Sequence, residues 1–286
     1  MGDVIFNLKE PHDFGWLMNL GHVSNVFDQQ DSGNLCFGVV ANGLKKFVKY
    51  AGAKTMEYSG DTATAVQRLI DAVAVYKDLR HPHLINLTDY FPTDQGYALV
   101  FDWFEGECLH SHWQFGPESK YTNPASPNFR FNRLPLGKRL DAYETILLFH
   151  KHVEEMEYVA IDFYDGSVLY DFAEGRTMIC DIDFYRKRPY TNRTGRMWGS
   201  TRFMSPEEFE LGATIDQRTN VFTMGATAFS LLGGTLDRSR ERWTAGDRSH
   251  EVALKAVSPL KEDRHSSIGD LYDAWMACYT GSRPKK

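Results

Sequence analysis

Two short segments in the second half of the chain carry carboxylates that could bind a metal ion. Asp162 opens the run 162–169, and Asp181 and Asp183 stand at the end of a short predicted strand. Carboxylates at strand or loop ends can bind Mg²⁺ through oxygen and position a hydroxyl nucleophile. Aspartate is also common in structural turns, so neither segment is specific alone. Only if the two segments converge would they form such a metal site.

A lysine in the first half could hold phosphate oxygens. Residues 45–49 alternate, so that Lys45, Phe47 and Lys49 share one face of a predicted strand. On a central strand, Lys49 would be a fixed positive charge for phosphate. On an edge strand these lysines would serve solubility instead, and the sequence leaves both interpretations open.

The elements around this lysine are predicted to form an antiparallel sheet with one helix. Residues 62–79 carry apolar side chains at helical spacing, and the helix ends before His81-Pro82. Asn42-Gly43 is typical of a two-residue hairpin turn. Strands are predicted, between turn residues, over 14–20, 26–29, 35–40, 44–51 and 97–103.

The second half is predicted to be mainly helical. Residues 110–135 hold four prolines and are predicted to be an inserted loop, followed by a long amphipathic helix over 136–156. Short strands are predicted at 168–169 and 178–180, and further helices near 206–211, 219–232, 250–256 and 268–278. A sheet-rich part followed by a helical part is an α+β arrangement.

Composition and charge restrict the partners. Hydrophobic residues make up 42% of the chain and charged residues 24%, which is typical of a soluble globular protein. The net charge of −6 argues against nucleic acid and against an anionic membrane surface. The apolar stretch 221–232 is too short to span a bilayer, and no secretory signal is evident. The four dispersed cysteines indicate reduced thiols, and we therefore expect a cytoplasmic protein.

The order of these segments resembles the protein kinase fold over almost the whole chain. Lys49 is similar to the lysine of the third strand, Asp162 to the catalytic-loop aspartate, and Asp181 to the aspartate that opens Asp-Phe-Gly. Further similar segments are 81–85, 99–106, 199–207, 216–225 and 262–267. The resemblance implies a single bilobal α+β domain over 1–286. It places a small antiparallel-sheet N-lobe with one helix at 1–103 and a larger helical C-lobe at 104–286.

The resemblance also implies ATP and Mg²⁺ as cofactors and gives roles to individual residues. Asp162 and Lys49 are the implied catalytic residues. Ser167, Asp181 and Asp183 are the implied metal ligands, and the choice of Asp181 or Asp183 as the principal one stays open. The implied cofactor-binding residues are Gly21, Ser24, Asn25, Val26, Phe47, Lys49, Asp71, Asp102, Phe104 and Leu169. Glu207 and Arg264 are implied to form a buried ion pair.

The sequence departs from the family pattern around the nucleotide. The turn at 21–26 holds one glycine and is closer to the Gly-x-Ser-Asn loop of aminoglycoside and choline kinases. Phe47 stands where a small residue is usual, so it either narrows the adenine pocket or stacks on the base. Ala72 stands at the position of the C-helix glutamate. Its neighbour Asp71 is either a shorter substitute or a solvated helix residue.

The catalytic loop departs from the pattern as well. Ser167 replaces an asparagine, and Asp183 could supply a compensating carboxylate. Ala160-Ile161 replaces His-Arg, so activation by a phosphate bound there is not expected. Tyr164 replaces the lysine that supports the γ-phosphate. The run 186–188 is then either its replacement or a solvated or partner-facing basic patch.

These observations predict an ATP-dependent phosphotransferase that resembles a Ser/Thr protein kinase and transfers the γ-phosphate to a hydroxyl of a protein or a small molecule. One alternative is a small-molecule kinase of the aminoglycoside or choline type, which the turn at 21–26 and the insertion favour. A second is a pseudokinase that acts as a scaffold, which the missing glycines, Phe47 and Ser167 favour. Neither nucleic acid nor membrane is predicted as a partner.

Overall fold

The computed structural model describes residues 4–279. Its internal contacts divide the chain into two compact units that meet in sequence at Glu105 and Gly106. The first unit is a sheet with one long helix, and the second is mostly helical. The predicted α+β class is therefore confirmed.

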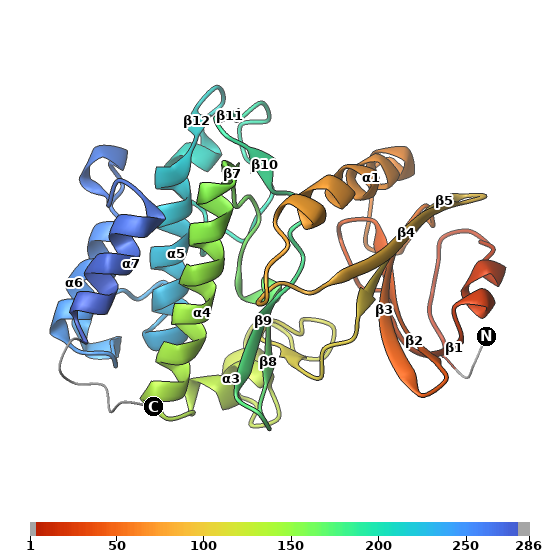
Figure 1. The fold of residues 1–286 in the computed structure, drawn as a ribbon, viewed down its shortest axis with the longest axis horizontal. Coiled ribbons are helices and arrows are strands. Elements are labelled where there is room, and N and C mark those ends of the chain that lie inside the picture. The colour runs from red at the N-terminus through yellow and green to blue at the C-terminus, as the bar shows by residue number, and fades with distance from the viewer. Residues whose placement is uncertain (1–3, 280–286) are drawn as a thin grey trace. The chain divides into compact units, whose positions relative to one another are not determined.

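The first unit is built on a five-stranded antiparallel sheet with the order β1-β2-β3-β5-β4 (Figure 1). Asn42 and Gly43 both have positive φ, as a tight hairpin turn between β2 and β3 requires, so the predicted hairpin is confirmed. The strands are β1 His22–Phe27, β2 Asn34–Ala41, β3 Leu44–Ala51, β4 Leu87–Thr93 and β5 Gly96–Asp102.

The long helix of this unit, α1 Thr62–Asp78, lies where the apolar spacing predicts it. Asp61 caps its N-terminus by accepting hydrogen bonds from the main-chain N–H and the hydroxyl of Thr64. The face formed by Ala65, Leu69 and Ala72 is buried. Burial of this apolar face fixes which residues of α1 point inward.

The prediction for the first thirty residues was wrong in part. Residues 14–20 form a short 3-10 helix, Gly15–Asn19, because Phe14 and Leu17 are buried and Met18 is exposed, a spacing of three rather than two. Gly21 leads into β1, and a Cβ there would lie 2.4 Å from the carbonyl oxygen of Val40. The predicted turn at 21–26 is therefore mostly strand, and the β1–β2 connection is formed by residues 28–33.

The second unit is organised around two long helices, α4 Leu136–Glu155 and α5 Gln217–Leu232. Helices α6 Asp247–Ala256 and α7 Ile268–Ala277 pack against α5, as Figure 1 shows in blue. One small sheet has the order β6-β8-β9, with β6 Glu107–Cys108, β8 Val168–Asp171 and β9 Arg176–Ile179. Two further strand pairs are β7 Tyr158–Val159 with β10 Arg186–Lys187, and β11 Tyr190–Thr191 with β12 Thr214–Ile215.

The predicted inserted loop at 110–135 contains folded structure. It holds two short helices, α2 Ser119–Thr122 and α3 Pro127–Asn132. Lys120, Asn128 and Phe131 are each at most 3% exposed, so the insertion contributes to the packed interior of the second unit. Across residues 4–279, the structure contains no helix with both the length and the apolar character needed to cross a bilayer.

Candidate functional site

Lys49 lies on β3, which pairs with β2 on one side and with β5 on the other. It stands opposite Cys36 and Leu99, and it is only 7% exposed. A buried lysine on a central strand is not a solubilising edge residue. The interpretation of Lys49 as a fixed positive charge therefore has the support of its position.

Asp71 does not serve as the acidic partner that the sequence suggested. It lies on the exposed side of α1, where its Oδ1 accepts a hydrogen bond from Gln67. Ala72, one position on, is fully buried, and a step of one residue turns a helix by about 100°. Asp71 is the solvated helix residue of the two alternatives.

The buried charged side chain of α1 is instead Arg68, which sequence reasoning missed. Its Nη1 donates to the main-chain oxygen of Ser32 at 2.8 Å, in the β1–β2 connection. Gly33, the next residue, has a φ of +81°, and a Cβ there would lie 2.7 Å from the Tyr58 ring. The connection 28–33 is thus held at its end by α1.

Aromatic rings gather around Phe47 within the first unit. Its ring centroid lies 6.0 Å from that of Phe27 on β1 and 6.3 Å from that of Phe101 on β5. Val26 and Asn25 belong to the same strand as Phe27, and Ser24 donates to the main-chain oxygen of Gly38. Aromatic rings offer a stacking surface for a planar base, although Phe47 is inclined to Phe27 by 48° and to Phe101 by 51°.

The residues predicted for the hinge are placed at the end of the first unit. Asp102 accepts hydrogen bonds from Asn86 at 2.7 Å and from Lys46 at 2.6 Å, and these bonds lower the pKa of its carboxyl. The Asp102 side chain is therefore committed to structure. Phe104 follows and is partly exposed, and Leu169, on β8 of the second unit, is also partly exposed.

Asp162 and Asp181 share an unusual backbone conformation. Their φ angles are +63° and +56°, in the left-handed region that few residues other than glycine adopt. Both side chains are partly exposed. The main-chain N–H of Cys180, just before Asp181, donates to the oxygen of Ser167 at 2.9 Å, which ties the two loops together. Backbone strain of this kind is concentrated at functional sites.

Ser167 and Asp183 differ in what their side chains offer. The Ser167 hydroxyl is fully buried and has no hydrogen-bond partner in the part of the chain that the structure describes. Asp183 is only 1% exposed. Residues 4–279 contain no cluster of three or more histidine, cysteine or acidic side chains able to hold a metal.

The main chain before Asp162 is held by Asn220 of α5. Asn220 Oδ1 accepts a hydrogen bond from the N–H of Ala160 at 2.8 Å, and its Nδ2 donates to the oxygen of Tyr158 at 3.1 Å. Asn220 is 1% exposed on a helix that is buried on almost every side. A polar residue in such a helix must have partners. An asparagine within a largely apolar helix was therefore the signal in the sequence from which a structural role for Asn220 could be inferred.

Asp165 joins the loop 162–167 to two distant segments. Arg202 donates to both carboxylate oxygens, at 2.9 and 2.8 Å, and the ammonium of Lys120 in α2 forms a further ion pair. Burial opposes ionisation of Asp165, but the bonds from Arg202 and the charge of Lys120 prevail and lower its pKa. Sequence reasoning missed this group because its members are far apart along the chain.

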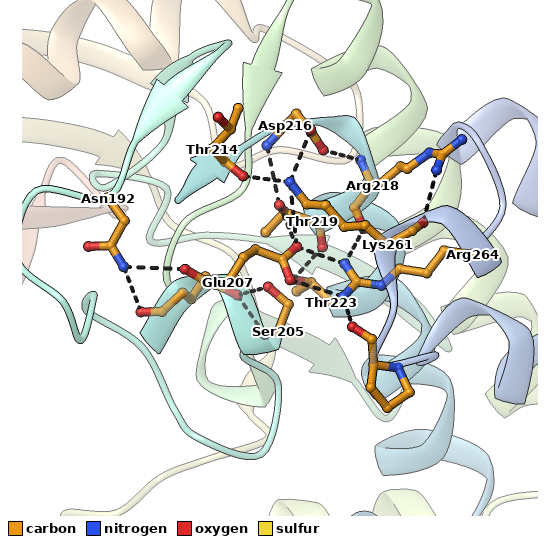
Figure 2. Close-up of polar contacts among 12 residues, drawn as sticks. Asn192, Ser205, Glu207, Thr214, Asp216, Arg218, Thr219, Thr223, Lys261 and Arg264 are labelled. Atoms are coloured by element: carbon orange, nitrogen blue, oxygen red, sulfur yellow. Dashed lines mark hydrogen bonds and ion pairs between the residues drawn. The ribbon is translucent and has the colours of Figure 1, made fainter. Parts of the chain in front are cut away.

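The predicted ion pair between Glu207 and Arg264 is confirmed. Figure 2 shows the guanidinium of Arg264 facing the Glu207 carboxylate, with two hydrogen bonds of 2.7 and 2.9 Å. Thr219 donates to the same carboxylate at 2.9 Å. Burial works against ionisation of Glu207, but the bonds from Arg264 outweigh it and lower the pKa. The pair anchors the end of the stretch 199–207 to α5 and to the chain that leads into α7.

The basic side chains of residues 186–188 donate hydrogen bonds to main-chain oxygens of the second unit. Arg186 donates to the main-chain oxygen of Asp183, Lys187 to that of Met156, and Arg188 to that of Glu154. Each cation thus has a structural partner in the second unit. A purely solvated basic patch would not show such bonds.

The comparison with known families agrees with this arrangement. A family model of the protein kinase domain matches residues 31–268, which is most of the chain. The chain therefore belongs to the protein kinase domain family, and the suspected resemblance is confirmed. No curated protein matches the chain.

Proposed function

We propose that this protein is an ATP-dependent phosphotransferase that transfers the γ-phosphate to a hydroxyl group. The observation that carries the proposal is the shared left-handed conformation of Asp162 and Asp181, on loops joined by the Ser167–Cys180 hydrogen bond. Both carboxylates are partly exposed, as residues that meet a substrate or a metal must be. Family membership supports the same class of reaction.

Three residues fit a site for Mg²⁺. The unpartnered hydroxyl of Ser167 is the kind of orphaned oxygen that a cation would satisfy, and Asp181 would supply the charge. Asp183 would act in a supporting role because its side chain is almost completely buried. Bound Mg²⁺ would neutralise charge on the nucleotide phosphates.

Asp162 would receive the proton of the acceptor hydroxyl. As the hydroxyl oxygen forms its bond to the γ-phosphorus, the bond to the leaving ADP oxygen breaks, and the proton passes to the Asp162 carboxylate. Lys49 would hold nucleotide phosphate oxygens as a fixed charge. Catalysis of this type depends mainly on positioning and on charge stabilisation.

We further propose that the β1–β2 connection, residues 28–33, faces the nucleotide phosphates in place of Gly21. In protein kinases the phosphates lie under a glycine-rich loop. Gly33 and Ser32, whose main-chain oxygen accepts the bond from Arg68, belong to such a connection here, whereas Ser24, Asn25 and Val26 lie in β1. Gly21 is explained by its close approach to Val40.

A protein hydroxyl is the acceptor that we favour. The bidentate pair of Glu207 and Arg264 orders the end of a segment that protein kinases use for peptide substrates. The support for an aminoglycoside- or choline-type kinase has weakened, because most of the predicted turn at 21–26 is strand β1.

We also propose a location in the cytoplasm. The four cysteines form no disulfide within residues 4–279, which agrees with a place in the cytoplasm.

A pseudokinase that acts as a scaffold remains the second candidate, and a specific observation favours it. Asp71 faces outward, and α1 places Ala72 on the buried face instead of an acid. The rings of Phe27, Phe47 and Phe101 also crowd the surface proposed for the base. If the protein is a scaffold, these features weaken its binding of nucleotide.

The deciding experiment measures nucleotide binding and turnover in the same preparations. We expect Mg·ATP to raise the melting temperature of the wild type, and Asp162→Asn to keep this shift while turnover with generic protein substrates falls about 10²- to 10⁴-fold. The matched control is Asp273→Asn on the exposed side of α7, which should behave as wild type.

Each other outcome has a definite meaning. A magnesium-dependent shift without any turnover supports the scaffold and overturns the enzyme. Turnover of a small hydroxyl compound but of no protein overturns the favoured acceptor. Equal turnover in Asp162→Asn and in wild type would remove Asp162 from the mechanism.

A further inference from the structure

The carboxylate of Asp165 is the centre of a buried cluster that the proposed reaction does not use directly. Asp165 is 2% exposed and lies three residues after Asp162. It meets Arg202 and Lys120, whose side chains are 17% and 4% exposed. A buried carboxylate with two cationic partners is a strong and geometrically specific contact.

Each partner is itself oriented by a neighbour. Arg202 Nη1 also donates to the hydroxyl of Tyr121 at 3.1 Å, and Lys120 donates to Nδ1 of His110 at 2.7 Å. Burial, together with the charge of Lys120, lowers the pKa of His110 to about 4, so the ring is neutral and accepts this bond. Because every partner has a partner, the cluster is held in one arrangement.

The cluster links three segments of the second unit. Lys120 and Tyr121 come from α2 in the insertion, Asp165 from the catalytic loop, and Arg202 from the stretch 199–207 that ends at Glu207. The insertion therefore packs against the catalytic loop through Lys120. Arg202 connects this loop to the stretch 199–207, called the segment below.

The contact between Arg202 and Asp165 can replace an interaction that the catalytic loop lacks. The residues before Asp162 are Ala160 and Ile161, so no arginine stands there to bind a phosphate on the segment. In kinases that depend on such a phosphate, new bonds from arginine order the segment. Here Arg202 makes bonds of that type to a carboxylate already present in the chain.

We propose that Arg202 and Lys120, by clamping Asp165, hold the segment and the catalytic loop in their working arrangement without phosphorylation. The three are positioning residues, and the regulatory part of this inference rests on the proposed phosphotransfer. The insertion at 110–135 is then required for activity even though it carries no group proposed to touch the nucleotide.

The test compares hydrogen exchange and kinetics in protein that has been treated with phosphatase and shown by mass to be unphosphorylated. In the wild type, amides of 199–204 should be protected. Arg202→Met should speed their exchange about tenfold or more, and Lys120→Met should do so for 162–168. Matched controls are Arg193→Met, six residues before the stretch 199–207, and Lys138→Met on α4, both at exposed positions.

The kinetic measurement separates positioning from general loss of structure. Arg202→Met should lower kcat about tenfold while KM for ATP changes by less than about twofold. Arg202→Lys, which keeps the charge but not the paired bonds, should recover part of kcat. If Arg202→Met does not fold, Arg202→Lys and Lys120→Arg carry the comparison.

Two results would overturn the proposal that Arg202 and Lys120 order the segment through Asp165. One is exchange at 199–204 in the Arg202 variants that matches the Arg193→Met control. The other is a wild type whose segment exchanges freely until it is phosphorylated. Failure of the proposed function looks different, because a chain without turnover would still show protection at 199–204.

Discussion

We propose Asp181 rather than Asp183 as the principal metal ligand. Asp181 combines a φ of +56° with partial exposure, whereas the side chain of Asp183 is almost entirely buried. A strained backbone persists only where surrounding structure holds it, and it commonly directs a side chain to a ligand. The hydrogen bond from Cys180 to Ser167 supplies such a restraint directly before Asp181. The sequence left this choice open because both aspartates have the same chemistry.

The buried carboxylate of Glu208 should make the stability of the folded protein depend on pH. Its carboxylate is 2% exposed and accepts hydrogen bonds from the N–H and hydroxyl of Ser205. Burial raises its pKa from the ordinary 4.5 to about 7. The folded protein therefore binds this proton more tightly than the unfolded chain. The resulting stabilisation is complete below about pH 4.5 and is lost as pH rises through about 7.

Glu208→Gln should remove this loss because glutamine stays neutral and can still accept the bonds from Ser205. We expect similar unfolding free energies for variant and wild type at pH 5. At pH 8 the variant should be more stable by up to about 3 kcal/mol, from the change in pKa. Urea denaturation across this pH range measures the effect, with exposed Glu210→Gln as control. Parallel pH profiles for Glu208→Gln and wild type would contradict the prediction.

Helix α5 is the element on which the second unit depends most. It carries Asn220, which holds the chain before Asp162, and Thr219, which bonds Glu207. Gly225, in its middle, faces the end of α6. A Cβ at this glycine would lie 2.7 Å from Cβ of Ala256 and 2.8 Å from Cγ1 of Val257. The close approach of α5 and α6 therefore requires a residue without a side chain.

Gly225→Ala should destabilise the protein by about 1–3 kcal/mol, because the helices must move apart to admit a methyl group. The matched control is Gly137→Ala near the start of α4, where a Cβ meets nothing within 4 Å. That change should stabilise the protein by about 0.5–1 kcal/mol through helix propensity. Urea denaturation of both variants provides the test. A neutral or stabilising Gly225→Ala would show that α5 and α6 are packed less closely.

Elements with strong local signals were predictable from the sequence. Asn42-Gly43 defined the β2–β3 hairpin, and the apolar spacing of α1 defined its buried face. Strand β4 was missed because it is a largely exposed edge strand that contains Pro92, so it lacks an apolar alternation. Residues 14–20 were assigned to a strand because their apolar content is high, although Leu17 and Phe14 are three positions apart.

At the scale of the whole chain, contacts were predictable where they belong to a motif of the family. The pair of Glu207 and Arg264 follows from the family pattern and is confirmed, whereas the roles of Asp162, Asp181 and Lys49 follow from the order of segments and stay predictions. The Asp165 cluster could not be predicted in this way. Its partners are separated from it by 45 and 37 positions, and only the folded chain brings them together.

The match to the protein kinase domain begins at residue 31, yet the structure before it is part of the first unit. Phe14 and Leu17 lie in the same core as Phe37 and Val48 of the sheet. Phe6 packs edge-on against Phe14 and Phe37, at ring distances of 5.5 and 5.9 Å. Residues 4–20 therefore cover one face of the sheet that carries Lys49.

This cover should be required for the stability of the first unit. Leu17→Ala removes a side chain that is 0% exposed, and we expect a loss of about 2–5 kcal/mol in unfolding free energy. Met18→Ala, its neighbour in the same short helix, is the control, because Met18 is 68% exposed and should change stability by less than about 0.5 kcal/mol. Urea denaturation gives the free energies, and hydrogen exchange over 35–50 shows whether the sheet is the part affected. Equal effects of the two substitutions would mean that residues before 31 are an appendage, and that the matched range holds the sheet together alone.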